Sequence, residues 1–134
     1  MAKYKKKLDA DIRCPLEYGL AIFGGKSGEY PQKLYKALMN SQTVLTVWDD
    51  ARLVGLIRVL DDSEMLAQIH YVLVHPEYQG QGIAGRMVEY IKEKYKNFMY
   101  LELMPEDKNN VPFYEKHGFH VMENGAAMQI CNIN

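Results

Sequence analysis

The central part of the chain contains four runs rich in β-branched and aromatic residues, separated by turns or by a longer amphipathic run. Such runs are typical of strands. The expected strands are Thr43–Trp48, Arg52–Leu60, Leu66–Val74 and Phe98–Met104. A short turn, Asp49-Asp50-Ala51, joins the first two strands as a hairpin, and the third strand extends them into an antiparallel meander. Pro76 cannot donate to a strand ladder, so it ends this meander.

One amphipathic run, from Ile83 to about Tyr95, has apolar residues at helical spacing on one side and charged residues on the other. Because this helix joins Leu66–Val74 to Phe98–Met104, those strands are expected to be parallel, with a right-handed crossover. Other helices are expected at Pro15–Phe23, Pro31–Met39 and Asn110–His117, and other strands at Tyr4–Leu8, Phe119–Met122 and Ala126–Ile130. This order predicts an α/β fold (α+β, with a mixed sheet), in which an antiparallel meander precedes a parallel β-α-β unit. With no repeat or linker, residues 1–134 are interpreted as a single domain.

Composition and charge exclude several classes of protein. The 134 residues are 48% hydrophobic and 25% charged, which is typical of a globular domain. A net charge of −1 gives no general attraction for nucleic acid or an anionic membrane, so neither is expected as a partner. No run reaches membrane-spanning length, and Asp9, Asp11 and Arg13 interrupt the region where a signal peptide would be apolar. Cys14 and Cys131 lack metal-ligand spacing, so no metal is expected, and reduced thiols in a cytoplasmic protein are the default.

The most informative short segment is Gln79-Gly80-Gln81-Gly82-Ile83-Ala84, between the strand Leu66–Val74 and the long helix. Gly80 and Gly82 have no Cβ, so an anion can approach the backbone closely and φ can be positive. Backbone N–H groups at such a helix start, aided by the helix dipole, bind phosphate without requiring a particular side chain. The segment therefore predicts a diphosphate-binding loop.

This loop fits the pattern Gln/Arg-x-x-Gly-x-Gly/Ala and resembles the coenzyme A pyrophosphate loop of the GNAT family of N-acetyltransferases. A second segment, Phe113–Phe119, resembles the Tyr-x-x-x-Gly-Phe element of the same family, at a similar distance after the loop. The resemblance spans roughly Thr43 to Ile130 and implies the acyl-CoA N-acyltransferase (GNAT) fold. Many relatives have an asparagine seven residues before the tyrosine. Here that position is Asp107, so the contact of that residue with the coenzyme is not carried over.

The resemblance implies direct transfer of an acetyl group from acetyl-CoA, the expected co-substrate, to an amine within a ternary complex. In relatives the strand before the loop splays at a bulge, and its backbone pairs with the pantetheine arm and the thioester oxygen. The matching residues here are Val72, Leu73 and Val74, whose side chains alone indicate only a buried strand. The coenzyme-binding residues that the resemblance implies are these three, with Gln79, Gly80, Gln81, Gly82, Ile83, Ala84 and Gly85.

Tyr114 matches the family tyrosine that protonates the leaving thiolate. A phenol with an ordinary pKa of about 10 is protonated at neutral pH and can donate to sulfur. Without the motif, a core tyrosine with a buried partner would be the better interpretation. With the motif, a catalytic acid is favoured.

His70 is the candidate general base. Strand alternation predicts that it shares a face with Val72 and Val74, and an imidazole pKa of about 6.5 suits removal of an ammonium proton. The run from His70 to Pro76 resembles the corresponding strand of the arylalkylamine (serotonin) N-acetyltransferases, which carry two histidines two residues apart. Here the first of that pair is Gln68, so a water chain is an alternative base. A histidine that only pairs across the sheet is an equally open interpretation.

These residues predict an N-acetyltransferase that acts on a primary amine of a small molecule or peptide. The alternative is a non-catalytic module that binds coenzyme A, which Gln68 and Asp107 leave open and which Tyr114 argues against. Arylalkylamines, polyamines, aminoglycosides, amino acids and protein N-termini all stay open as acceptors. Small members of this family often dimerise, and Ala126–Ile130 would form a sheet edge, so a homodimer is also an expectation.

Overall fold

The structure, a computed structural model, describes residues 3–5 and 29–132. The chain forms two compact units, Met1–Leu103 and Met104–Asn134. Within the described residues, the first unit contains the sheet and the helices α2 and α3, and the second contains a short helix and the C-terminal segment. The expected helix at Pro15–Phe23 and residues 6–8 of the expected first strand lie outside the described residues.

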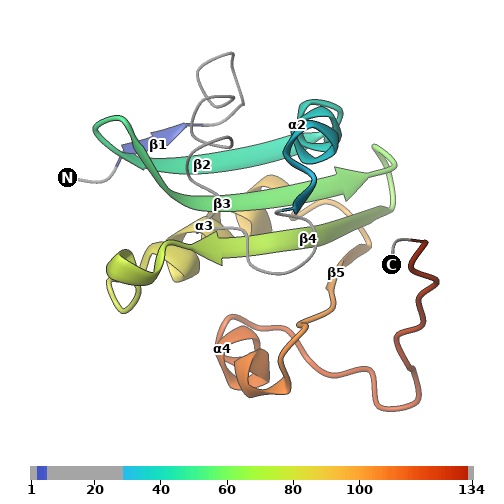
Figure 1. The fold of residues 1–134 in the computed structure, drawn as a ribbon. Coiled ribbons are helices and arrows are strands. Elements are labelled where there is room, and N and C mark those ends of the chain that lie inside the picture. Colours follow the sequence, from blue (N-terminus) through green and yellow to red (C-terminus); the bar gives the residue numbers. More distant parts are fainter. Residues whose placement is uncertain (1–2, 6–28, 133–134) are drawn as a thin grey trace. The chain divides into compact units, whose positions relative to one another are not determined.

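The first unit is built on a five-stranded sheet with the order β1-β2-β3-β4-β5 (Figure 1). Its strands are β1 (Lys3–Lys5), β2 (Thr43–Asp49), β3 (Arg52–Asp61), β4 (Leu66–Val74) and β5 (Tyr100–Leu103). Neighbouring strands from β1 to β4 are antiparallel, and β5 pairs parallel with β4. The expected meander followed by a parallel β-α-β unit is therefore confirmed, with β5 shorter than the expected Phe98–Met104.

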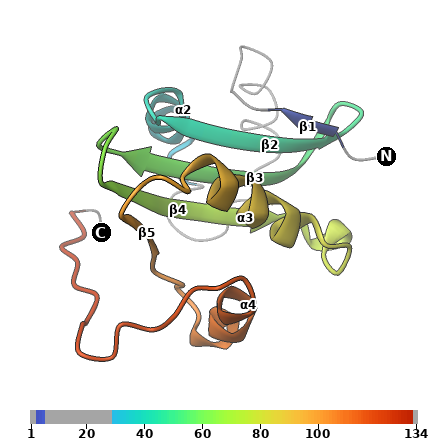
Figure 2. The ribbon, with the colours of Figure 1, turned by 180° about the vertical axis from the view of Figure 1, so that it is seen from behind.

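The two described helices of this unit lie on opposite faces of the sheet. α2 (Pro31–Met39) lies on one side and α3 (Ile83–Lys94) lies on the other (Figure 1 and Figure 2). α2 has the expected bounds and begins at a proline, whose fixed φ suits a helix start. Its buried residues Leu34 and Leu38 form a hydrophobic cluster with residues of β2 and β3, namely Val44, Trp48, Leu53 and Leu56.

α3 approaches the sheet closely at its first turn. A Cβ on Gly55 would lie 3.1 Å from Ile83 Cγ2 and 3.2 Å from the side chain of Val47, so a larger residue would push the helix away from β3. Further along α3, Met87 and Ile91 are fully buried. This packing fixes where the helix begins, and with it the end of the preceding loop.

The other end of α3 is held by Tyr95, which follows its last turn. The Tyr95 hydroxyl donates to Asp61 Oδ2 at 2.6 Å and lies 2.6 Å from Thr43 Oγ1, within a second hydrogen bond. Burial, together with the hydrogen bond to Asp61, raises the pKa of Tyr95 to about 12. Both ends of α3 are therefore fixed on the same sheet.

The second unit contains a 3₁₀ turn, η5 (Lys108–Asn110), and the helix α4 (Val111–Lys116). α4 lies within the expected helix at Asn110–His117. It is followed by His117 and by Gly118, whose φ is 94° and whose N–H donates to Glu115 O at 3.0 Å. The N–H of Phe119 donates to Tyr114 O at 3.1 Å, which completes a Schellman motif.

The expected strands at Phe119–Met122 and Ala126–Ile130 are wrong, because neither segment has regular secondary structure. No strand among the described residues pairs with them. The side chains of Met128 and Ile130 are 94% and 87% exposed. The tendency of such residues to form strands reflects packing on a half-buried sheet surface, and this segment has no such surface.

Candidate functional site

The candidate site begins at β4, where the pairing of the sheet changes. One edge of β4 pairs with β3 from Ala67 to Val74, but the other edge pairs with β5 only from Leu66 to Ile69. Among the described residues, no strand pairs with this second edge from residue 70 to residue 74. Backbone N–H and C=O groups on such an edge need partners, so a ligand can bind there.

A β-bulge lies where this open edge begins. Arg58 pairs with Tyr71 and its neighbour Val59 pairs with Ile69, so His70 is the extra residue on β4. A bulge bends its strand and increases the local twist, which suits the separation of β4 from β5 at this point. The open edge after the bulge is the stretch Val72–Val74 that was expected to bind the pantetheine arm.

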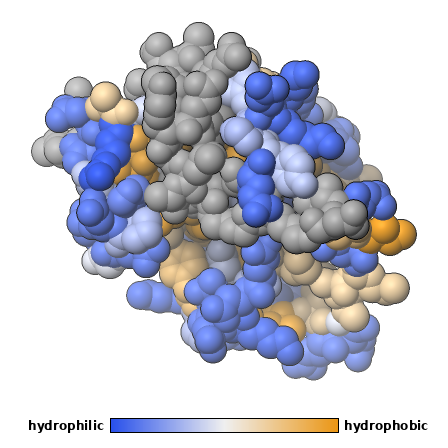
Figure 3. Space-filling model, in the orientation of Figure 1, coloured by the Kyte–Doolittle hydropathy of each residue, from blue (hydrophilic) through white to orange (hydrophobic). Residues whose placement is uncertain are grey.

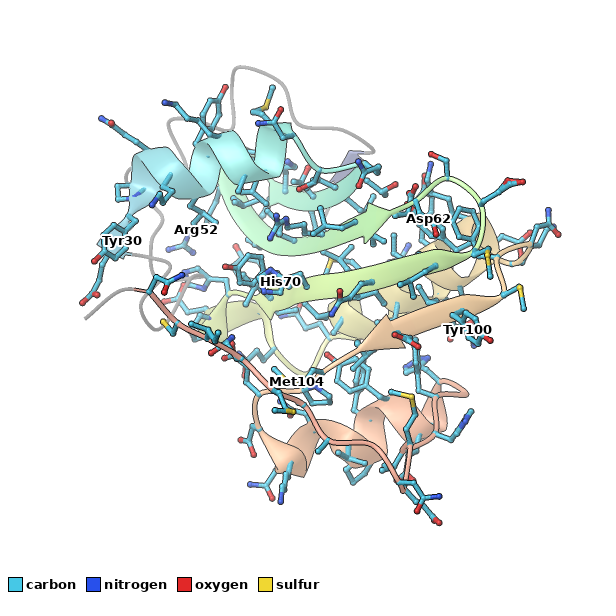
Figure 4. The ribbon with its side chains drawn as sticks, turned by 90° about the vertical axis from the view of Figure 1, so that its right-hand side faces the viewer. Tyr30, Arg52, Asp62, His70, Tyr100 and Met104 are labelled. Carbon is cyan, nitrogen blue, oxygen red and sulfur yellow. The ribbon has the colours of Figure 1, made fainter. Side chains whose placement is uncertain are left out.

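The bulge also changes the face on which His70 lies. The predicted face, shared with Val72 and Val74, is wrong. Val72 pairs with Ile57, whereas His70 Nδ1 lies 2.7 Å from Nη1 of Arg58, the next residue of β3, whose side chain is on the opposite face. His70 therefore lies on the α2 side of β4 (Figure 4).

The turn after β4 fixes the path of the chain toward α3. It contains a 3₁₀ turn, η4 (Pro76–Tyr78). The N–H of His75 donates to Val54 O at 2.8 Å, and Nε2 of Gln79 donates to Val74 O at 3.2 Å. Two side-chain contacts attach the turn to the β2–β3 hairpin, from Tyr78 to Asp49 and from Arg52 to Glu77.

The loop that follows requires glycine at two positions. Gly80 and Gly82 both have a φ of 81°, in the left-handed region that favours glycine. A Cβ built at either position has no heavy atom within 4 Å, so the backbone conformation imposes the requirement, and crowding does not. The space beside both glycines is open to a ligand.

The loop ends at the N-terminus of α3. Gly82 precedes the first turn, and no side chain caps it. The N–H of Arg86 donates to Gly82 O at 3.1 Å, so the N–H groups of Ile83, Ala84 and Gly85 have no acceptor within the helix. These donors, the positive end of the helix dipole and the open space beside the glycines fit a diphosphate group.

Tyr114 lies on α4, in the second unit. Its ring contacts those of Phe113 and Phe119 edge to face, with centroids 5.0 and 6.0 Å away. Burial raises the pKa of the Tyr114 phenol, so its hydroxyl keeps its proton through the neutral range. Asp107, at the position that differs from many relatives, accepts from the N–H of Asn109 at 2.9 Å and caps η5.

Arg58 was not among the residues predicted for the site, although a cation in the middle of an otherwise apolar strand could have pointed to it. Its Nη1 donates to His70 Nδ1 at 2.7 Å, and its Nε donates to Ser41 Oγ at 2.7 Å. A guanidinium has no acceptor, so His70 Nδ1 must accept and the neutral ring carries its proton on Nε2. The lone pair with which His70 would take up a proton therefore faces Arg58.

Other parts of the surface are less informative. A hollow of about 560 Å³ beside the start of α2 is lined by residues 30–33 and Lys36. In the part of the chain that the structure describes, no three His, Cys, Asp or Glu side chains are grouped to hold a metal ion. Within the same residues, no helix has the length and apolar character needed to cross a membrane. The surface drawn in Figure 3 is largely hydrophilic where it is coloured.

Residues 16–119 match the family model described as the acetyltransferase (GNAT) family. This range includes the sheet from β2 to β5, the glycine loop and Tyr114. The chain therefore belongs to the GNAT family of acetyltransferases.

Individual relatives agree with this family. An uncharacterised N-acetyltransferase from Bacillus methanolicus is 34% identical over 73 residues, which cover 54% of this chain and 58% of that protein. The chain spans a little more than half the length of the curated relatives it matches. A GNAT-family acetyltransferase from Streptococcus pneumoniae TIGR4 is 25% identical, with a TM-score of 0.78 and coverage of 100% of this chain and 98% of that one. A predicted acetyltransferase from Clostridium acetobutylicum, solved with acetyl-CoA, shares the fold at 19% identity, with a TM-score of 0.66 and 96% coverage of each chain.

Proposed function

We propose that this protein transfers an acetyl group from acetyl-CoA to a primary amine. The observation that carries the proposal is the succession of an open strand edge and a glycine loop at the N-terminus of α3. The first can pair with an extended amide-containing chain, and the second can hold a diphosphate. Coenzyme A has both parts. Membership of the GNAT family supports acetyl-CoA as the co-substrate.

In this proposal the coenzyme lies along these two features. The backbone of Val72, Leu73 and Val74 pairs with the pantetheine arm, and the N–H groups from Gln79 to Gly85 hold the diphosphate. Because backbone groups make these contacts, the side chains on this stretch are free to pack in the core. The glycines keep the loop in the conformation that presents its N–H groups.

Acetyl transfer would then proceed by direct attack. The lone pair of the neutral amine forms a C–N bond with the thioester carbonyl carbon, and the C–S bond breaks with its electron pair on sulfur. N–H groups of the open edge of β4 stabilise the negative charge that develops on the carbonyl oxygen. Tyr114 donates its proton to the departing thiolate, a role that its raised pKa permits at neutral pH.

The amine must lose a proton, and His70 is the proposed base. To accept a proton, His70 Nδ1 must give up its hydrogen bond with Arg58. Because the loss of that bond is unfavourable, it favours the alternative in which a water chain accepts the proton. If His70 is the base, His70→Ala changes the acidic limb of the pH–rate profile. If the acidic limb is unchanged in His70→Ala, water is the acceptor of the amine's proton.

We infer that both units act as one acetyltransferase domain, residues 1–134, because the loop belongs to the first unit and Tyr114 to the second. The proposed acceptor is an amine of a small molecule or peptide. If the protein is similar in function to the arylalkylamine N-acetyltransferases, this acceptor is an arylalkylamine. A cytoplasmic location is part of the same proposal.

The test is release of thiol from acetyl-CoA with a panel of arylalkylamines, polyamines, aminoglycosides, amino acids and peptides. We expect thiol release with at least one of these classes, and an acetylated product of matching mass. Coenzyme A binding, measured by thermal shift on the same preparation, separates the outcomes. Binding with no transfer to any amine would favour the non-catalytic coenzyme A-binding module, and absence of both would contradict the proposal.

A further inference from the structure

The α2 face of the sheet contains a cation that pairs with no acid among the described residues. Arg58 is half-buried in the middle of β3, and its two hydrogen-bond acceptors, Ser41 Oγ and His70 Nδ1, are both uncharged. Of the residues that the structure describes, no carboxylate forms an ion pair with it. Burial lowers the pKa of Arg58, as it does for any cation partly removed from water. A buried charge without a counter-charge is unfavourable and therefore calls for an explanation.

The guanidinium also has unused donors in a suitable geometry. Of its five N–H groups, Ser41 takes the one on Nε and His70 takes one on Nη1. One N–H on Nη1 and two on Nη2 have no acceptor among residues 3–5 and 29–132. A carboxylate binds in parallel to one N–H from each of these two nitrogens. The ring of Tyr71, 5.8 Å from Arg58 Cζ, and the bond to Ser41 hold the guanidinium in place.

This cation lies beside the region where transfer is proposed. His70, which Arg58 contacts, is the bulged residue at which the open edge of β4 begins. Ser41 in turn donates to Ala37 O at 2.7 Å, so the same group of side chains connects the end of α2 to β4. A group bound to Arg58 would therefore stand next to the strand edge that is proposed to present the thioester.

We propose that Arg58 binds a carboxylate of the acceptor, so that the preferred acceptors are amines that also carry an acid group, such as amino acids. This inference rests on the proposed acetyl transfer and narrows its substrate class. The acid group would supply the missing counter-charge and use the unused donors. Ser41 and Tyr71 position the guanidinium and do not contact the acceptor in this arrangement.

The test compares pairs of amines that differ only by the acid group, phenylalanine with phenethylamine and leucine with isopentylamine. We expect wild type to show a higher kcat/KM for the acid-bearing member of each pair. Arg58→Gln should reduce that preference by about 10- to 100-fold, chiefly through KM of the acid-bearing amine. The preference is the ratio of the two kcat/KM values within a pair. Comparing this ratio between wild type and Arg58→Gln cancels the intrinsic differences in amine reactivity. The KM for acetyl-CoA should not change.

The control is Lys92→Gln, which removes one positive charge from a partly exposed position on α3. It should keep the wild-type preference. If Arg58→Gln does not fold, Arg58→Lys keeps the charge but loses the two-nitrogen fork, and should still raise KM several-fold for acid-bearing amines only. If the folded Arg58 variants keep the wild-type preference for acid-bearing amines, the proposal is wrong. Arg58 would then have only the structural role of connecting Ser41, after α2, to His70 on β4. A stronger preference for phosphoethanolamine than for β-alanine would also overturn the assignment to a carboxylate.

A binding measurement separates this inference from the proposed function. Phenylalanine and phenethylamine are titrated into the protein with coenzyme A present, where no transfer can occur. Tighter binding of phenylalanine, lost in Arg58→Gln, would support the carboxylate site even if no amine were ever acetylated. Equal binding of the two amines by wild type would contradict the carboxylate site, whatever the outcome for acetyl transfer.

Discussion

Tyr114 has the most specific proposed role of any single residue. If its hydroxyl protonates the leaving thiolate, Tyr114→Phe should reduce kcat by about 10²- to 10⁴-fold, the range for a positioned proton donor. Coenzyme A binding and the KM for acetyl-CoA should change little, because the hydroxyl matters most as charge develops on sulfur. Steady-state kinetics with thermal shift on the same variant check both. Tyr90→Phe, a half-buried tyrosine of α3, is the control, and full activity in Tyr114→Phe would refute the acid role.

Gly82 is the residue on which the coenzyme loop depends. Its φ of 81° is unfavourable for a β-branched residue, so Gly82→Val should shift the loop and misdirect the N–H groups at the start of α3. We expect the rise in melting temperature caused by coenzyme A to be reduced or lost in this variant. Gly125→Val, at a glycine without a positive φ, should keep the full rise. Equal stabilisation of wild type and folded Gly82→Val would show that the loop does not hold the coenzyme.

The sequence predicted some of these residues and not others, for a physical reason. Gly80 and Gly82 could be predicted because a positive φ restricts the choice of residue at the position itself. Arg58 could not be assigned a role, since that role depends on a neighbour, His70, whose face is set by a bulge. A single extra residue cannot be recognised in a largely apolar sequence, so strict alternation predicted the wrong face for His70.

Among the elements, α3 is held at its far end by the hydrogen bonds of Tyr95. The pKa of Tyr95 in the folded protein is about 12 and exceeds the ordinary value of about 10, so the folded protein holds the phenol proton more tightly than the unfolded chain. This contribution to stability is complete below about pH 10 and is lost as the pH rises through 12. Tyr95→Phe should therefore cost about 1–3 kcal/mol near pH 8, where Asp61 and Thr43 lose their partner.

Urea denaturation of wild type and Tyr95→Phe at pH 8 and pH 11 checks this expectation. The gap in unfolding free energy should narrow at pH 11, because only wild type loses the contribution of the protonated phenol. Tyr100→Phe, at a position that is 50% exposed, should match wild type at both values. A gap of constant size would contradict the assigned cause.

The accuracy of the element predictions follows the strength of local signals. α2 was predicted with its observed bounds, because a proline start and a helical apolar pattern are both local. The last two strands were wrong, because a strand also needs a neighbour with which to pair, and an apolar run such as Ala126–Ile130 does not reveal whether one is present. Short apolar runs near a chain end are therefore the weakest part of such a prediction.

At the scale of the whole molecule, the C-terminal segment bears on assembly. The homodimer expected from the sequence relied on the frequent dimerisation of small family members and on a strand at Ala126–Ile130. That strand is not formed, so the second reason no longer holds. Four large apolar side chains of this segment are nevertheless more than half exposed, and they offer a surface for a second copy: Val121, Met122, Met128 and Ile130. We still predict a concentration-dependent dimer by light scattering. Replacing Met128 and Ile130 by serine should shift it toward monomer, and a strict monomer at high concentration would remove the prediction.

The bulge at His70 also has a consequence for the length of β4. Before the bulge, Ala67 and Ile69 face α3, and after it Val72 and Val74 do, so odd positions are replaced by even ones at this residue. The alternation of side chains between the two faces therefore shifts by one position within β4, and His70 is the extra residue at which it shifts. Deletion of His70 would leave one regular alternation, in which Tyr71 and Leu73 still face α2 and Val72 and Val74 still face α3. A redesign of β4 that keeps its nine residues must therefore keep the bulge, because strict alternation through His70 would turn the segment 71–74 over and remove Tyr71 and Leu73 from the cluster under α2.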